Sequence, residues 1–113
     1  KPFLIEVKTL LMPSNHAMID LSTENLTLLK KIISEYIPEC EIRVFGSRVN
    51  GTAKPYSDID IALKCGSPID RRTMSRLKEA LQESTLPIRI DILDWNSISE
   101  EFRGVIEEGY EVI

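Results

Sequence analysis

The apolar residues of this chain recur at two spacings, one typical of helices and the other typical of strands. Between Ser22, which can cap a helix, and Pro38, which stops one, apolar positions are three or four residues apart. These positions are Leu26, Leu29, Ile33 and Ile37. The spacing predicts a helix that packs one face against the rest of the molecule.

Segments that alternate polar and apolar residues predict strands with one buried face. They are Glu41–Phe45, Asp58–Leu63 and Ile88–Leu93. In the last of these segments Ile88, Ile90 and Ile92 share the face that we expect to lie inward.

Two further helices are predicted after the second strand. The first follows the break at Cys65–Pro68. Its inward side is expected to consist of Met74, Leu77 and Leu81. The second begins with a capping-box pattern, Ser97 and Glu100, and ends at Gly109. Its inward side is expected to consist of Phe102, Val105 and Ile106.

A Gly-Ser turn follows the first predicted strand directly. Ser47 can cap a short helical turn, which Gly51 closes. The free backbone N–H groups and the serine hydroxyl would then point at an anion above the strand end. Gly46 and Ser47 are therefore candidate phosphate-binding residues, although a glycine can also serve backbone geometry alone.

Two carboxylates follow this turn on the second predicted strand. Asp58 and Asp60 share one face about 6.6 Å apart, because alternate side chains of a strand point the same way. Carboxylates this close repel each other, and a divalent cation relieves that repulsion. Mg²⁺ in particular is held by one or two carboxylates together with substrate phosphates. The pattern indicates a site for a nucleoside triphosphate and Mg²⁺.

Asp91 is the candidate third acid, since it alternates with the isoleucines of its own predicted strand. If the two strands are neighbours, three carboxylates meet and two metal ions about 3.5 to 4 Å apart could flank a displacement at phosphorus. Asp94 is an alternative, but its place at the strand end favours a role in a turn. Arg48 and Lys54 could reach the triphosphate, or could be solvated as loop cations usually are.

The residues Gly46-Ser47, a gap of ten residues, Asp58-Ile59-Asp60 and the later Asp91 resemble the signature of the DNA polymerase beta-like nucleotidyltransferases. More narrowly, this short chain resembles the minimal nucleotidyltransferases of prokaryotes in its GSRVNG opening, its SDIDIAL and RIDILDW strands and its closing EEFRGVIEEGYEVI. The resemblance implies an α/β (α+β) fold with a small mixed β-sheet flanked by helices. It also implies that Asp58, Asp60 and Asp91 are catalytic and bind two Mg²⁺ ions, while Gly46 and Ser47 hold the triphosphate of ATP.

The same resemblance implies a partner. Many members of the family are paired with a helical HEPN ribonuclease toxin and act as its antitoxin by moving AMP from ATP onto a tyrosine of the toxin. Two alternatives remain open at the level of sequence. The chain could neutralise a helical partner by binding alone, or it could transfer a nucleotide to a small molecule such as an aminoglycoside.

Composition is compatible with one small enzyme domain. The chain has 113 residues, of which 42% are hydrophobic and 28% charged, as expected for one folded core. Its net charge of -4 provides no general field for nucleic acid, so templated polymerisation is disfavoured. No apolar run reaches the about 20 residues that cross a bilayer, which favours a cytoplasmic location.

The cysteines and the N-terminal region add two expectations. Cys40 and Cys65 have no metal-ligand spacing and are expected to remain reduced. Residues 1–17 depart from the pattern of the rest and are interpreted as an extension, native or vector-derived, before a nucleotidyltransferase domain at 18–113. The single histidine, His16, lies in that extension and is a poor candidate for a catalytic base.

Overall fold

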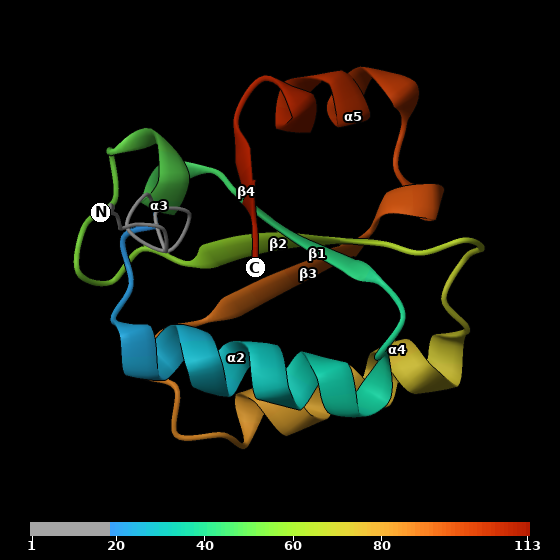
Figure 1. Cartoon of the computed structure of the whole chain (residues 1–113), viewed down its shortest axis with the longest axis horizontal. Coiled ribbons are helices and arrows are strands. Elements are labelled where there is room, and N and C mark those ends of the chain that lie inside the picture. The colour runs from blue at the N-terminus through green and yellow to red at the C-terminus, as the bar shows by residue number, and fades with distance from the viewer. Residues whose placement is uncertain (1–18) are drawn as a thin grey trace, which may run out of the picture.

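A mixed sheet of four strands organises the protein, with helices on both sides of it (Figure 1). The structure, a computed structural model, describes residues 19–113. Along the sheet the strands are β3 (Ile90–Asp94), β2 (Ile59–Lys64), β1 (Glu41–Phe45) and β4 (Tyr110–Val112). β1 is antiparallel to both β2 and β4, whereas β2 and β3 are parallel. The predicted fold, a small mixed sheet flanked by helices, is confirmed.

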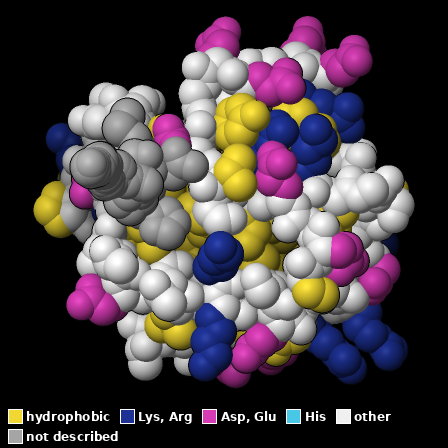
Figure 2. Space-filling view, viewed as in Figure 1, with side chains coloured by type: hydrophobic (Ala, Val, Ile, Leu, Met, Phe, Trp, Pro, Cys, Tyr) yellow, Lys and Arg dark blue, Asp and Glu magenta, His cyan; other side chains and the backbone are white. Residues whose placement is uncertain are grey.

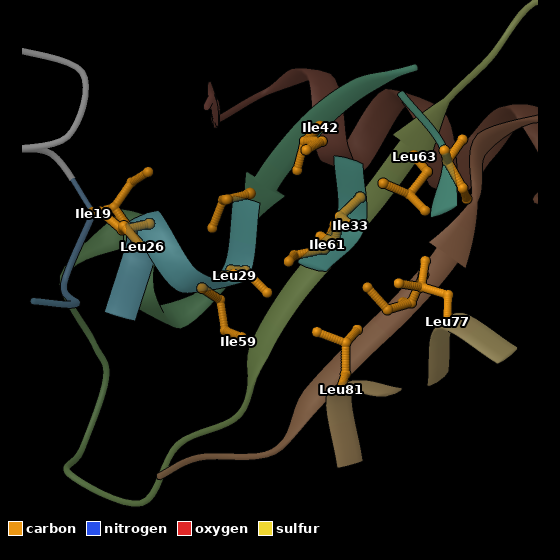
Figure 3. Close-up of a cluster of buried hydrophobic side chains, with 13 residues drawn as sticks. Ile19, Leu26, Leu29, Ile33, Ile42, Ile59, Ile61, Leu63, Leu77 and Leu81 are labelled. Atoms are coloured by element: carbon orange, nitrogen blue, oxygen red, sulfur yellow. The ribbon is translucent and has the colours of Figure 1, made fainter. Parts of the chain in front are cut away.

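Helices α2 (Thr23–Tyr36) and α4 (Arg71–Gln82) cover one face of the sheet (Figure 1). Both begin with a side-chain cap: Ser22 accepts a hydrogen bond from the amide of Asn25, and Asp70 accepts one from the amide of Thr73. Between helices and sheet lies the main core, which Figure 3 shows converging on β2. Its fully buried members are Leu29, Ile33, Val44, Ile59, Ile61, Leu63 and Leu77.

The opposite face of the sheet is covered by a 3₁₀ turn, η1 (Trp95–Ser97), and by α5 (Glu100–Glu107). The predicted capping box is wrong by two residues, because Ser99 and not Ser97 accepts the hydrogen bond from the amide of Phe102. The prediction that three side chains of this helix face inward is also wrong for two of them. Phe102 and Val105 are 37% and 57% exposed, and only Ile106 is fully buried.

Two elements of the fold were not predicted from sequence. η1 follows β3 directly, and β4 adds a three-residue edge strand after α5. The third strand is shorter than predicted, since it begins at Ile90 and leaves Ile88 and Arg89 in the preceding segment. The proposed extension at 1–17 and His16 lie outside the described residues. Within residues 19–113, every helix is too short or too polar to span a membrane.

Cys40 and Cys65 form a disulfide, which corrects the expectation that they remain reduced. The reason is the strand register. Glu41, the first residue of β1, pairs with Lys64, the last residue of β2, so Cys40 and Cys65 meet just beyond this pair, at the open end of the two strands. Their Cα atoms are 4.5 Å apart, within the range that a disulfide requires. Spacing in the sequence could not show this, because the pairing depends on how β1 and β2 align.

Replacing both cysteines by serine should lower the melting temperature of the oxidised protein. The disulfide closes a loop with a sequence separation of 25 residues, and chain-entropy arguments assign such a loop about 3 kcal/mol of stabilisation. Calorimetry with and without reductant measures the effect. Wild type in reductant should melt near the double variant, and equal melting temperatures for oxidised and reduced wild type would contradict the expectation.

Candidate functional site

Strand pairing brings two of the predicted acids side by side. Asp60 on β2 pairs with Asp91 on β3 and, on its other side, with Phe45 on β1. Because directly paired residues point to the same face of a sheet, both carboxylates lie on the face away from α2 and α4. The chain turns into the Gly-Ser segment immediately after Phe45, so this segment is next to the acids.

Asp58 lies one residue before β2 and not on the strand as predicted. The strand ladder begins next to it, where the amide of Ile59 donates to the carbonyl of Arg89. Its carboxylate is nevertheless close enough to raise the pKa of Asp60. The three acids named from sequence therefore form one electrostatic group.

The pKa of Asp60 is raised above its ordinary value by partial burial first, and then by the negative charges of Asp91 and Asp58. The ionised form of Asp60 is therefore less favourable in the folded protein than in the unfolded chain. A cation placed among the three acids would remove this penalty.

Without divalent metal, the free energy of unfolding should fall as the pH rises from about the ordinary value of 3.8 through the raised pKa of Asp60. The sign follows from proton binding: in this window the folded state holds the proton more tightly than the unfolded state, so deprotonation costs stability. Urea titrations of wild type and Asp60→Asn across this window test the point. The variant should lack the part of the fall in unfolding free energy that comes from Asp60. Parallel curves of unfolding free energy against pH for the two proteins would contradict the raised pKa of Asp60.

Gly46 is in direct contact with the acid group. Its backbone has φ 84° and ψ -155°, a region that only glycine adopts readily. A Cβ at this position would lie 2.4 Å from Oδ2 of Asp60. The turn therefore requires glycine for two independent reasons, and one of them is the carboxylate itself.

The Gly-Ser turn leads into α3 (Ser47–Asn50). The prediction that Ser47 caps this turn is wrong, because Gly46 occupies the N-cap position and no side chain makes a cap hydrogen bond. Ser47 is instead the first helical residue. Gly51 closes the turn in the left-handed conformation, as predicted. The first amides of α3 have no helical carbonyl partner, so a ligand can bind them.

Arg48 does not lie where the sequence interpretation placed it. Its side chain is buried, and its guanidinium donates hydrogen bonds to the carbonyls of Asp20, Lys54, Pro55 and Ser57. These contacts leave it engaged with the loop that precedes Asp58. The structure therefore gives Arg48 a role in holding that loop in place and not in contacting a triphosphate.

Asp94 has a structural role in a turn, as its place at the strand end predicts. One of its carboxylate oxygens accepts from the amide of Asn96, and the other accepts from the amide of Ile69 at 2.8 Å. It thereby caps η1 and fixes the end of the loop that leads into α4. It is not a competitor of Asp91 as the third acid.

Sequence reasoning missed a cationic and aromatic cluster on the same face of the sheet. Arg43 is buried, with its guanidinium carbon 4.8 Å from the ring centre of Trp95 and 4.3 Å from that of Tyr110. Lys64 and Arg103 also approach Trp95. Figure 2 shows Lys and Arg side chains gathered below α5. The alternation in Glu41–Phe45 could have predicted that Arg43 lies on this face of the sheet, because Arg43 and Phe45 are two residues apart on one strand.

The donor set of the acid group suits a hard cation, because all three residues offer carboxylate oxygens. Among residues 19–113, no group of at least three His, Cys, Asp or Glu side chains is placed so that it could hold a metal ion by itself. Mg²⁺ does not require such a group, because it is usually shared between carboxylates and substrate phosphates. The residues present therefore fit an ion that binds together with a triphosphate.

Comparison with known proteins agrees with this geometry. Residues 29–113 match the family model described as polymerase beta, nucleotidyltransferase. The chain is also 44% identical over 100 residues to the probable protein adenylyltransferase MntA of Haemophilus influenzae, and the match covers 88% of each chain.

Solved structures with a similar fold are chains of toxin-antitoxin complexes. One was crystallised with AMP-PNP; it is 27% identical, has a TM-score of 0.66, and is matched over 81% of this chain and 72% of that chain. Another contains the tri-AMPylated HEPN toxin of Shewanella oneidensis with its MNT antitoxin, at 25% identity and a TM-score of 0.63 over 81% and 71% of the chains. With its acids, its Gly-Ser turn and these matches, the chain belongs to the polymerase beta nucleotidyltransferase family.

Proposed function

We propose that this protein transfers AMP from ATP to a hydroxyl group of a HEPN toxin, a tyrosine in particular, and thereby acts as its antitoxin. The observation that carries the proposal is the acid group: Asp60 is paired with Asp91, lies near Asp58 and contacts Gly46 of the Gly-Ser turn. The probable protein adenylyltransferase of Haemophilus influenzae and the AMPylated Shewanella complex support the choice of reaction and acceptor.

In the proposed reaction the acceptor oxygen attacks the α-phosphorus of ATP. A new phosphorus–oxygen bond forms, the bond to the bridging oxygen breaks, and pyrophosphate leaves with that electron pair. Asp91 is the exposed member of the acid group and can accept the hydroxyl proton. The Ser47 hydroxyl and the first amides of α3 hold the departing phosphates.

Asp58, Asp60 and Asp91 would hold Mg²⁺, and we propose two ions. When bound, the metal neutralises the triphosphate charge and stabilises the charge that develops in the displacement. A further complex of a similar chain, 25% identical with a TM-score of 0.65, carries glutamate in place of two aspartates separated by one residue. Asp58 and Asp60 have that spacing, which supports their assignment.

We further propose that the nucleotidyltransferase domain spans residues 18–113 and that the protein works in the cytoplasm, where its toxin would cleave RNA. A reducing cytoplasm would keep Cys40 and Cys65 largely as thiols, so the disulfide would belong to the oxidised protein. Alkylation of free thiols at the moment of lysis, followed by mass spectrometry, distinguishes the two states.

Co-expression with a HEPN protein from the same organism tests the function. Wild type should add AMP to the partner, which is seen as a gain in the partner's intact mass. The modification should silence the partner's ribonuclease activity, because the added anionic group fills the RNA-binding groove of the partner and repels the RNA backbone. If Asp58→Asn/Asp60→Asn protects cells equally well and leaves the partner unmodified, neutralisation is by binding alone.

ATP and Mg²⁺ should each strengthen the binding of the other, because the acid group shares the ion with the triphosphate. Calorimetric titration of ATP should give weak binding in EDTA and clearly tighter binding in Mg²⁺. Ser47→Ala should weaken the binding in Mg²⁺ modestly, since one hydroxyl contact is lost. Equal ATP affinity in EDTA and in Mg²⁺ would contradict the proposed site.

A further inference from the structure

One edge of the sheet is open next to the acid group. β3 is the last strand of the sheet, and within residues 19–113 no strand pairs with its outer side. Such an edge presents unpaired backbone N–H and C=O groups to any chain that lies beside it. The five residues of β3 extend over about 16 Å, long enough for a short extended segment.

Two cavities lie along this edge, between β3 and α4. One, of about 480 Å³, is lined by the start of β3 and the second half of α4, and Asp91 is part of its wall. The other, of about 550 Å³, is lined by the end of β3 and the first half of α4. Lys78 and Ile92 line both cavities, so the cavities are adjacent, and we call the two together the β3 groove.

On the α4 side, the β3 groove is lined by side chains from one face of the helix. The residues are Arg71, Met74, Ser75, Lys78, Leu81 and Gln82. They recur at spacings of three and four residues, which places them on one face of the helix. The intervening Arg72 and Arg76 are exposed and line neither cavity.

The lining has a definite chemistry. Apolar side chains such as Ile92 and Leu93 lie beside three cations, Arg71, Lys78 and Arg89. Two acids also line the groove: Asp91 belongs to the acid group, and the carboxylate of Asp94 accepts hydrogen bonds from the amides of Ile69 and Asn96. The lining therefore has one more cation than acids, whereas the chain as a whole has a net charge of -4. A segment that is acidic and partly apolar would complement the lining.

We propose that the β3 groove binds the extended, acidic segment of the partner that carries the acceptor hydroxyl. This inference rests on the proposed function. The segment lies along the open edge of β3, and its acidic side chains pair with Lys78 and its neighbours. It reaches the acid group by passing over this edge at Asp91, whose carboxylate lies on the face away from α4. The groove thus gives a domain of this size the acceptor-binding surface that the reaction needs.

Binding to the purified HEPN partner tests the proposal with matched variants of one helix. In the Asp58→Asn/Asp60→Asn background, where no transfer can change the partner, Lys78→Glu should weaken the complex about five- to tenfold and reduce its salt dependence. Arg76→Glu makes the same change in charge two residues away, outside the groove, and should bind like its parent. Equal effects of the two substitutions would overturn the proposal.

Cross-linking identifies the occupant. A benzoylphenylalanine placed at Ser75, inside the groove, should cross-link to the partner segment that contains the acceptor hydroxyl, whereas the same probe at Arg76 should not. A cross-link from Ser75 to a second copy of this chain, or to a part of the partner distant from the acceptor, would overturn the proposal.

A failure of the groove proposal can be distinguished from a failure of the transferase proposal. If wild type transfers no AMP but Ser75 cross-links to the expected segment, the groove assignment stands and the transferase proposal fails. If transfer proceeds and Lys78→Glu leaves its KM unchanged, the groove assignment fails and the transferase proposal stands.

Discussion

Asp58→Asn and Asp60→Asn should each lower AMP transfer by at least about a hundredfold while the domain remains folded. Each substitution removes a carboxylate that would hold the metal, and the triphosphate charge is then left uncompensated. The measurement is the single-turnover rate of AMP transfer to the HEPN partner at saturating Mg²⁺. Asp20→Asn, which changes an exposed acid outside the proposed site, is the matched control and should keep full activity.

The same variants make a second measurement decisive. At neutral pH and without divalent metal, Asp60→Asn should melt at the same temperature as wild type or higher, because it removes a carboxylate whose pKa is raised by burial and by Asp91 and Asp58. A loss of activity combined with a gain of stability is typical of a functional residue and not of a structural one. A fully active Asp60→Asn protein would refute the site assignment.

Gly46→Ala should abolish transfer and also destabilise the fold. A Cβ at position 46 would lie 2.4 Å from Oδ2 of Asp60, so the carboxylate or the turn must move. The backbone conformation at φ 84° and ψ -155° adds a cost of about 1 to 3 kcal/mol for any other residue. Thermal melting and the transfer rate measure the two effects separately.

Gly51→Ala is the informative comparison, because Gly51 also has a positive φ, of 87°, but a Cβ there would meet nothing within 4 Å. It should cost about 1 kcal/mol, as left-handed positions do, and leave the transfer rate close to that of wild type. If the two variants lost activity equally, the contact between Gly46 and Asp60 would have no special importance for the site.

The alternating pattern of the strands was sufficient to predict the part of the fold that carries the site. β1 was predicted with its bounds correct, and the parity of the isoleucines placed Asp60 and Asp91 on the face away from the main core. This works because alternation is a local property, repeated along each strand by the burial of one face. Whether β2 and β3 were neighbours could only be assumed.

The errors lie where long-range pairing decides the outcome. β4 has only three residues and exists because β1 offers it an edge, so its own sequence carries little signal. Cys40 and Cys65 meet through the register of two strands. Arg48 was expected to contact a ligand, but the carbonyls it binds include that of Asp20, which is 28 positions away.

β2 serves stability and chemistry on opposite sides of one strand. Ile59, Ile61 and Leu63 are fully buried in the main core, whereas Asp60 faces the proposed site. A saturation scan of this strand should therefore give two interleaved profiles. Substitutions at the odd positions would reduce the amount of folded protein in the cell, and those at position 60 would leave that amount unchanged while the toxin escapes control. An antitoxin of this design can fail in two distinguishable ways within a single strand.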